Sequence, residues 1–150
     1  MRSAGITFDQ LGLPFTWRYG PSNRGIGDVS YATQTHAFTG VGLRPYAPVH
    51  IRGARNAGGD LTLSWIRRTR AGGDNWDASD VPLSEDVESY EIDIMWGATV
   101  KRTISSTIAS AVYTAAQQLA DFGAAQSSVT VRVYQMSARF GRGSPGTTIV

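Results

Sequence analysis

Apolar and polar residues alternate in several short stretches of the chain. Apolar side chains recur at every second position in FTWRY (15–19), LTLSW (61–65), YEIDI (90–94) and VTVRV (129–133). A period of two places the apolar side chains on one face of a β-strand and the residues between them on the other face. Clusters of Gly, Pro, Asn and Asp separate the stretches, as is typical of turns. The pattern predicts an all-β protein.

The segment 106–126 departs from this alternation. It is rich in Ala and Gln, which favour a helix, whereas Val112-Tyr113-Thr114 favours a strand. We expect a strand through about Thr114 and then a short helical turn over 115–120 that carries Leu119 into the core. A longer helix is the alternative.

The sequence predicts a domain boundary near residue 45. GLRPYAPVHIRG (42–53) carries two prolines, and the residue before each proline is restricted to extended geometry. The strands that follow are spaced like those of a seven-strand β-sandwich. We therefore expect two parts: an N-terminal β flank over residues 1–46, which is the end of a preceding domain, and a sandwich over residues 47–150.

Composition excludes several classes of site. The 150 residues include no cysteine, so disulfides, thiolate zinc sites and cysteine nucleophiles are excluded. The net charge is +2, but residues 71–100 carry −8 while residues 1–70 carry +6 and residues 101–150 carry +4. A nucleic-acid partner is not expected, because its binding face would be basic without an equal acidic block. The sequence indicates neither a membrane span nor a secretory signal.

Residues 47–150 resemble a fibronectin type III module, strand by strand. APVHIRG, GDLTLSWIRR, SYEIDIM, TVKRTIS, SAVYTA, VTVRVYQMS and TTIV match its strands in order, with Trp65 at the core tryptophan position. The resemblance implies an immunoglobulin-like β-sandwich. The sixth strand of such modules opens with a tyrosine whose hydroxyl ties a corner, and Val129 stands there in this chain. The corner must then be secured in another way.

A narrower resemblance covers almost the whole chain. GVGLRPYAPVHIR, DLTLSWIRRTRAGGDNW, YTAAQQLADFG and VRVYQMS followed by GRG are similar to the C-terminal part of the host-specificity protein at the tail tip of gene transfer agents and siphophage-like particles, a member of the phage tail hub family. The resemblance implies a virion component, made in the bacterial cytoplasm and placed at the tail tip. Its partners would be other tail or baseplate proteins, preceding domains of a longer chain and a cell-surface glycan.

Acidic residues and histidines offer candidate chemistry, but none fits an established pattern. Asp74, Asp77 and Asp80 lack the alternating spacing and closing glutamate of a calcium loop, so an arginine-paired, solvated loop is favoured and no metal or cofactor is expected. The carboxylates from Glu85 to Asp93 fall on one loop and the outward face of one strand, where solvation is favoured over glycosidase chemistry. His36 and His50 fall in predicted strands without a nucleophile motif.

Two predicted connections remain as candidates for binding. They span residues 68–88 and 137–146, and a fibronectin-like sandwich places both at the same end. Long loops on a rigid scaffold often bind, and Trp, Phe and Arg are typical anchors. The candidate binding residues are Arg70, Trp76, Arg139, Phe140 and Arg142. The alternative is that acids in one connection pair with arginines in the other and only close the end of the sandwich.

Together these features predict a non-enzymatic module of a phage-like tail tip. It would contact the recipient cell surface or space the tail tip. The alternative from another class is a carbohydrate-binding accessory module of a cell-wall or polysaccharide hydrolase.

Overall fold

The computed structural model describes residues 5–75, 77 and 80–150 of the chain. Contacts divide it into two compact units, Met1–Gly42 and Leu43–Val150. The division falls slightly before the boundary at residues 46 and 47 that the sequence suggests. Trp76, one of the candidate binding residues, lies outside the described residues.

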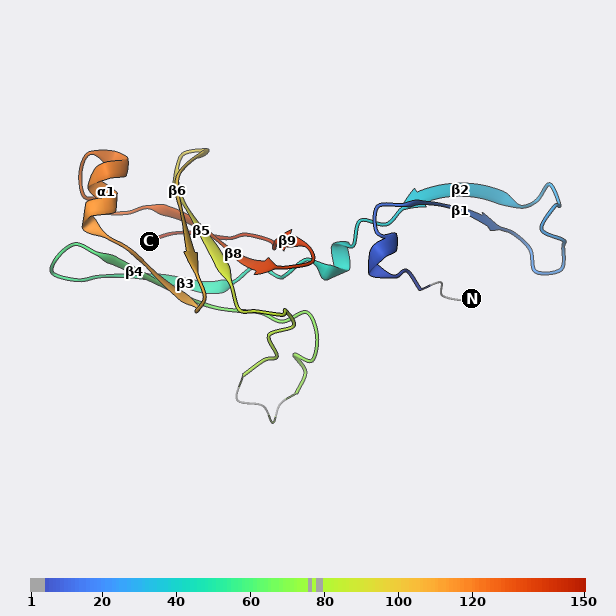
Figure 1. Cartoon of the computed structure of the whole chain (residues 1–150), viewed down its shortest axis with the longest axis horizontal. Helices are drawn as coiled ribbons and strands as arrows, with labels where there is room; N and C mark the ends of the chain where they lie inside the picture. Colours follow the sequence, from blue (N-terminus) through green and yellow to red (C-terminus); the bar gives the residue numbers. More distant parts are fainter. Residues whose placement is uncertain (1–4, 76, 78–79) are drawn as a thin grey trace. The chain divides into compact units, whose positions relative to one another are not determined.

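Unit 1 is an antiparallel β-hairpin preceded by a 3-10 turn. The turn η1 (Phe8–Gln10) leads into β1 (Pro14–Tyr19), which pairs with β2 (Ala32–Ala37) over its whole length (Figure 1). A second 3-10 turn, η2 (Val41–Leu43), spans the boundary between the units. The stretch FTWRY therefore lies in a paired strand, β1, as its alternating apolar residues predict.

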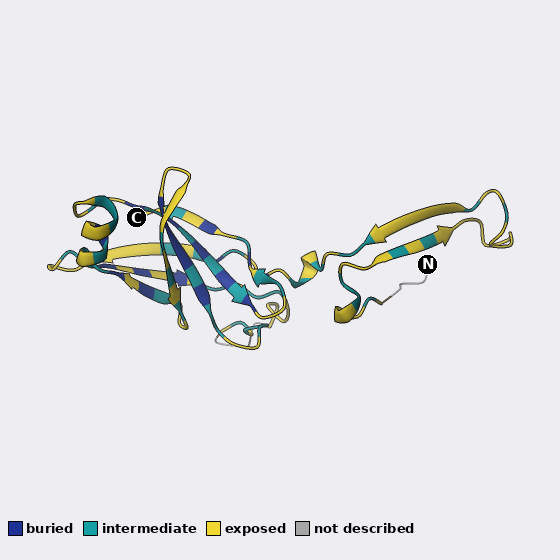
Figure 2. Cartoon of the chain, turned by 45° about the horizontal axis from the view of Figure 1, so that its top comes forward, coloured by how far each residue is buried: buried dark blue, intermediate teal, exposed yellow. Residues whose placement is uncertain are grey.

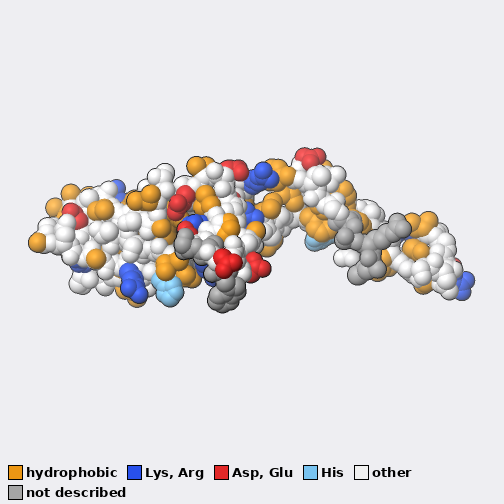
Figure 3. Space-filling model, turned by 90° about the horizontal axis from the view of Figure 1, so that it is seen from below, with side chains coloured by type: hydrophobic (Ala, Val, Ile, Leu, Met, Phe, Trp, Pro, Cys, Tyr) orange, Lys and Arg blue, Asp and Glu red, His pale blue; other side chains and the backbone are white. Residues whose placement is uncertain are grey.

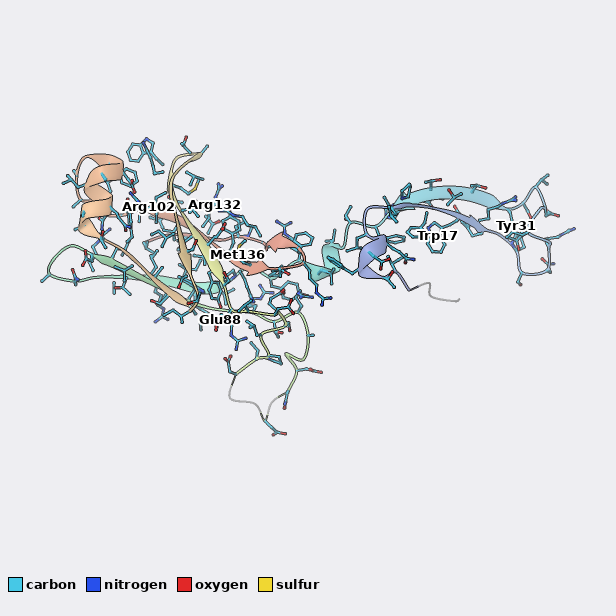
Figure 4. The ribbon with its side chains drawn as sticks, in the orientation of Figure 1. Trp17, Tyr31, Glu88, Arg102, Arg132 and Met136 are labelled. Carbon is cyan, nitrogen blue, oxygen red and sulfur yellow. The ribbon has the colours of Figure 1, made fainter. Side chains whose placement is uncertain are left out.

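Aromatic side chains hold the hairpin together. Trp17 lies edge-on to Phe38, with ring centres 6.1 Å apart, and the Tyr31 hydroxyl donates to the carbonyls of Pro21 and Arg24 (Figure 4). Gly20 is required beside Tyr31, because a Cβ there would lie 2.6 Å from its ring. Even so, none of the described residues of unit 1 is fully buried (Figure 2). A two-stranded hairpin without a buried core is only marginally stable in water.

Hydrogen exchange on the whole chain should separate the two units. We expect the amides of β1 and β2 to exchange roughly 100-fold or more faster than those in the core strands of unit 2, because the hairpin can open without unfolding the sandwich. Exchange resolved by NMR measures this difference. Equal protection of both units would contradict the marginal stability of the hairpin.

Unit 2 is a sandwich of two antiparallel sheets (Figure 2). One sheet has the order β3-β4-β7. The other has the order β10-β8-β5-β6, with the short β9 also paired to β8. The bounds are β3 Val49–Arg55, β4 Leu61–Ile66, β5 Tyr90–Trp96, β6 Thr99–Ser106, β7 Ser110–Tyr113, β8 Thr130–Ser137, β9 Gly141–Arg142 and β10 Gly146–Ile149. The strands are divided between the two sheets as in a fibronectin type III module. The predicted all-β, immunoglobulin-like fold is therefore confirmed.

The core consists of the alternating residues that the sequence picks out. Both sheets contribute, and Trp65 of β4 packs edge-on against Tyr90 of β5 with ring centres 5.1 Å apart. The buried apolar cluster is Leu61, Leu63, Trp65, Tyr90, Ile92, Ile94, Ala111, Tyr113, Val129, Val131 and Val133. His36 on β2 and His50 on β3 lie in strands and are exposed, as expected.

The β3 strand contains a bulge. Its register with β4 shifts between Val49 and Arg52, and His50 adopts a left-handed conformation with φ of 51°. A positive φ is uncommon for a residue other than glycine. The bulge therefore turns the strand locally while the rest of β3 stays paired with β4.

The helix after β7 differs from the prediction in one respect. Helix α1 (Ala115–Phe122) begins after the capping residue Thr114, as expected, and runs slightly longer than predicted. However, Leu119 is 59% exposed, whereas Gln118 is fully buried. The expectation that Leu119 enters the core is wrong. The reason is that Gln118 satisfies buried backbone groups that an apolar side chain would leave unpaired.

Gln118 ties three segments together. Its Nε2 donates to the carbonyls of Gly59 and Tyr113, at 3.0 and 3.1 Å. Its Oε1 accepts from Arg55 and from the backbone N–H of Gln126. All the hydrogen-bonding capacity of the amide nitrogen and oxygen is thus used between the β3–β4 turn, the end of β7 and the segment before β8.

A second group of side chains replaces the corner tyrosine. The hydroxyl of buried Tyr113 donates to Asp121 of α1 at 2.8 Å, and Arg102 of β6 donates to both Asp121 oxygens at 2.7 and 2.8 Å (Figure 4). The Arg102 hydrogen bonds hold the pKa of Asp121 below its ordinary value, although burial opposes this, and Tyr113 adds to the effect. Val129 has no hydroxyl with which to fasten this corner of the sandwich, and Asp121 of α1 fastens it instead.

Exchanging the polarity of two neighbouring helix positions tests this arrangement. Gln118→Leu should lower the free energy of unfolding by about 2–3 kcal/mol, because it leaves buried backbone groups unpaired. Leu119→Gln is the matched control and should change it by less than about 0.5 kcal/mol, since the site is exposed and both residues favour helices. Urea unfolding measures both values. If Leu119→Gln instead lowered the free energy of unfolding more than Gln118→Leu does, Leu119 would be the core residue of α1, as the sequence predicts.

Candidate functional site

The two candidate connections lie at the same end of the sandwich. The first runs from the end of β4 to the start of β5, and the second from the end of β8 to the start of β10, with the short β9 inside it. The start of β5 is hydrogen bonded to the end of β8, through Met136 N–H and Ser89 O at 2.8 Å. Figure 3 shows acidic side chains gathered where the first connection faces the viewer. The predicted placement of the two connections at one end is therefore observed.

Arg70 is held within the first connection. Its Nε and Nη2 donate to Glu85 Oε1 at 2.9 and 2.6 Å, and Nη2 also donates to the carbonyl of Ser84 at 2.8 Å. The Glu85 side chain is only 5% exposed. Arg67 pairs with Asp80 in the same connection. Arg70 therefore fastens the base of the connection, and the acids seen to pair here do so with arginines of the same segment.

Arg142 pairs with strand β5. Its Nη1 and Nη2 donate to the two oxygens of Asp93 at 2.7 and 3.1 Å, and its Nε donates to Glu91. The guanidinium also lies over the ring of Tyr134, 4.5 Å from its centre. Thr103 completes the group by donating to Asp93 at 2.6 Å. The Arg142 side chain thus crosses the outward face of β8 and ties β9, which pairs with the end of β8, to β5.

Asp93 corrects the expectation that the outward carboxylates of this strand are solvated. The residue is only 2% exposed. Burial alone would raise its pKa, but the hydrogen bonds from Arg142 and Thr103, with the charges of Arg142 and Arg132, outweigh burial and hold the pKa below its ordinary value. A buried charge requires such partners. The carboxylate is therefore an anchor within the sheet.

Phe140 and Arg139 stand between β8 and β9. Their backbone N–H groups both donate to the Ser137 hydroxyl at 3.3 Å, which fixes the turn. Arg139 is exposed, and Phe140 is half-buried. The guanidinium carbon of Arg44 lies 5.8 Å from the centre of the Phe140 ring, and Arg44 also donates to the carbonyl of Gly143. Phe140 is thus presented at the surface beside a cation.

Sequence reasoning missed two residues at this end, Arg44 and Tyr46. The guanidinium carbon of Arg68 lies 5.0 Å from the Tyr46 ring centre, and Tyr46 is 46% exposed. The segment is fixed here because Ser144 N–H donates to the carbonyl of Pro45. A tyrosine between two prolines in RPYAP was the available signal. We call Arg44, Tyr46, Arg68 and Phe140 the arginine–aromatic surface.

The described residues do not gather ligands for a metal ion. Within ranges 5–75, 77 and 80–150, no group of three or more His, Asp or Glu side chains could hold one. Asp80 is instead engaged by the N–H of Val81 and by Arg67. Across the same ranges, no helix has the length and apolar character needed to cross a membrane.

Comparisons with known proteins point to the fold alone. No protein-family model matches the sequence, and no curated protein sequence matches it either. Among solved structures, domains d3–d4 of the rat CD45 extracellular region are 10% identical with a TM-score of 0.50, over 100% of this chain and 69% of that chain. The FN5 domain of Drosophila Lar is 12% identical with a TM-score of 0.40, over 71% of this chain and 94% of that chain.

A structure described as a myokine is 18% identical with a TM-score of 0.44, over 71% of this chain and 95% of that chain. Identities this low carry no function from one protein to another. Together with the strand order, the similarity to the CD45 domains defines the fold of unit 2 as a fibronectin type III-like β-sandwich.

Removing the Arg142 side chain should destabilise the sandwich in a pH-dependent way. Arg142→Ala leaves Asp93 buried without its main partner and should cost about 3 kcal/mol of unfolding free energy at pH 7. In the parent protein the lowered pKa of Asp93 stabilises the fold above about pH 4, and that stabilisation is lost on further acidification. In the variant, burial favours the protonated acid, so the difference between the two proteins should shrink from pH 7 to pH 3.

Urea unfolding followed by tryptophan fluorescence at several pH values measures this. Arg52→Ala, an exposed arginine on β3, is the matched control and should change the unfolding free energy by less than about 0.5 kcal/mol. A pH-independent difference, or a loss equal to that of the control, would show that the Arg142–Asp93 pair does not anchor β9.

Proposed function

We propose that this chain is a non-enzymatic recognition module of the distal tail of a phage-like particle or gene transfer agent. In this proposal the arginine–aromatic surface contacts the recipient cell. The sequence resemblance to tail-tip host-specificity proteins supports the particle, and the fibronectin type III-like scaffold is compatible with a binding module.

The observation that carries the recognition role is that two rings, the exposed Tyr46 and the half-buried Phe140, each lie beside an arginine at one end of the sandwich. Phe140 and Tyr46 each lie beside a guanidinium, and aromatic residues and arginine are the side chains that most often dominate binding interfaces. The supporting segments are fastened by the Arg70–Glu85 pair and by the hydrogen bond between Ser144 and Pro45. A surface held in place before binding loses less entropy when a partner arrives.

The same network supports a non-enzymatic role. A carboxylate that acts as a general acid or base needs a free proton position near a substrate. Asp93 and Glu85 are instead engaged by arginines that hold them within the fold. These two carboxylates therefore serve the structure of the module.

The lack of a buried core among the described residues of unit 1 supports a place for the chain within a larger assembly. Its hairpin buries no described residue, and Leu13 and Tyr19 are more than half exposed. We expect this hairpin to pack against a neighbouring domain or another tail protein, because a two-stranded hairpin gains its stability from such a neighbour.

Adsorption of particles to recipient cells tests the recognition role. Phe140→Ala, Tyr46→Ala and Trp76→Ala should each reduce adsorption by about tenfold, as expected for an aromatic anchor worth more than about 1.4 kcal/mol. Particle yield and tail length should remain normal. Val112→Ala, an exposed apolar position on β7, is the matched control and should adsorb like the parent.

Other outcomes would redirect the proposal. If all three variants adsorb like the parent and the chain does not bind recipient envelopes, the module is a spacer. If the isolated chain cleaves a glycan, the non-enzymatic assignment is wrong.

A further inference from the structure

A pocket of about 240 Å³ lies at the end of the sandwich opposite the arginine–aromatic surface. It forms where β5 ends, β8 begins and β10 ends, and the segment after α1 closes its side. The β5–β6 turn and α1 that flank this region can be followed in Figure 1. This site is independent of the tail-tip role proposed above, because it uses none of the same residues.

An exposed indole forms one wall of the pocket. Trp96 is the last residue of β5 and is 62% exposed, and its ring packs on Phe122 of α1 with centres 5.6 Å apart and a tilt of 53°. Gly97 follows in a left-handed conformation with φ of 58°, and a Cβ there would meet no atom within 4 Å. The turn therefore leaves space beside the indole open, and Phe122, which also lines the pocket, packs against the ring.

Polar side chains without full internal partners line the rest of the pocket. Gln126 uses its Nε2 to donate to Ala124 and leaves its Oε1 without a partner among the described residues. The hydroxyls of Ser128 and Thr130 likewise make no side-chain hydrogen bond within the part of the chain that the structure describes. One amide oxygen and two hydroxyls are thus available to a ligand.

The lining carries no charge. The described residues around the pocket include no Asp, Glu, Lys or Arg. Neither an anion, nor a metal ion, nor a cationic ligand would find a counter-charge there. The volume is also below the range of about 300–1,000 Å³ that is typical for drug-sized ligands.

From these properties we propose that the Trp96 pocket binds one neutral pyranose ring of a saccharide. The negative face of an indole attracts the polarised C–H groups on the flat face of such a ring. The oxygen of Gln126 and the hydroxyls of Ser128 and Thr130 can exchange hydrogen bonds with its hydroxyl groups. A single ring in an open pocket should bind with a dissociation constant on the order of 1–10 mM.

Titration of the whole chain with simple glycosides tests the proposal. Methyl β-D-glucopyranoside, methyl β-D-galactopyranoside and methyl α-D-mannopyranoside are the probes, and cyclohexanol serves as an apolar ring of similar size with a single hydroxyl. We expect at least one glycoside to shift the NMR signals of the Trp96 indole, the Gln126 side chain and the amides of Gly97 and Thr130, with saturation. Cyclohexanol should bind at least about tenfold more weakly, because it cannot satisfy three polar groups.

Variants separate the aromatic and polar contributions. Trp96→Ala should weaken binding by about tenfold or more, and Thr130→Val, which keeps the shape of the side chain, by about threefold. Tyr19→Ala removes a ring of similar exposure in unit 1 and should leave binding unchanged. The proposal is overturned if no glycoside shifts these signals, if cyclohexanol binds as tightly as the best glycoside, or if Trp96→Ala binds like the parent.

Discussion

A buried carboxylate on the outward face of the larger sheet determines how one end of this module is built. Asp93 cannot remain charged at 2% exposure without a cation, and Arg142 supplies that cation from the strand segment that follows the β8–β9 connection. The Arg142 side chain reaches across the outward face of β8 to Asp93 and Glu91 on β5, while the backbone of β9 pairs with the end of β8. That position in turn fixes Phe140 and the carbonyl of Gly143, to which Arg44 is bound.

At the opposite end of the sandwich, polar groups at the edge of the core are also paired, but by different side chains. Tyr113, Arg102 and Asp121 share hydrogen bonds there, and Gln118 satisfies backbone groups of two further segments. These contacts orient α1, and α1 carries Phe122 against Trp96. The module therefore closes both ends of its core with polar networks, and each network positions one aromatic side chain at the surface, half-buried Phe140 at one end and exposed Trp96 at the other.

The apolar part of the fold follows from the sequence because alternation is a local property. Burial follows directly from this spacing for three residues of β4. Each is two positions from the next, so all lie on the same face of the strand: Leu61, Leu63 and Trp65. Gln118 and Asp93 were not predictable in this way, because burial of a polar group depends on partners far away in the sequence. Leu119 was misassigned for the same reason.

The candidate site was predictable only in part. The two connections could be placed at one end from strand order, and Arg70, Arg139, Phe140 and Arg142 are found there. What their side chains contact could not be predicted: Arg70 and Arg142 each bind carboxylates of the fold, whereas Arg44 and Tyr46 reach the same end from a segment that precedes the first strand of the sandwich. Such groupings arise from tertiary packing and leave little trace in local pattern.

The bulge at His50 has a consequence for how copies of this module can be crowded together. Strand β3 is at the edge of its sheet, and an edge strand with a regular row of free amides and carbonyls is a template for joining another chain. The shifted register between Val49 and Arg52 and the left-handed residue within it interrupt that row and twist it. The irregularity thus removes part of the regular backbone template that edge-to-edge pairing of two modules would need.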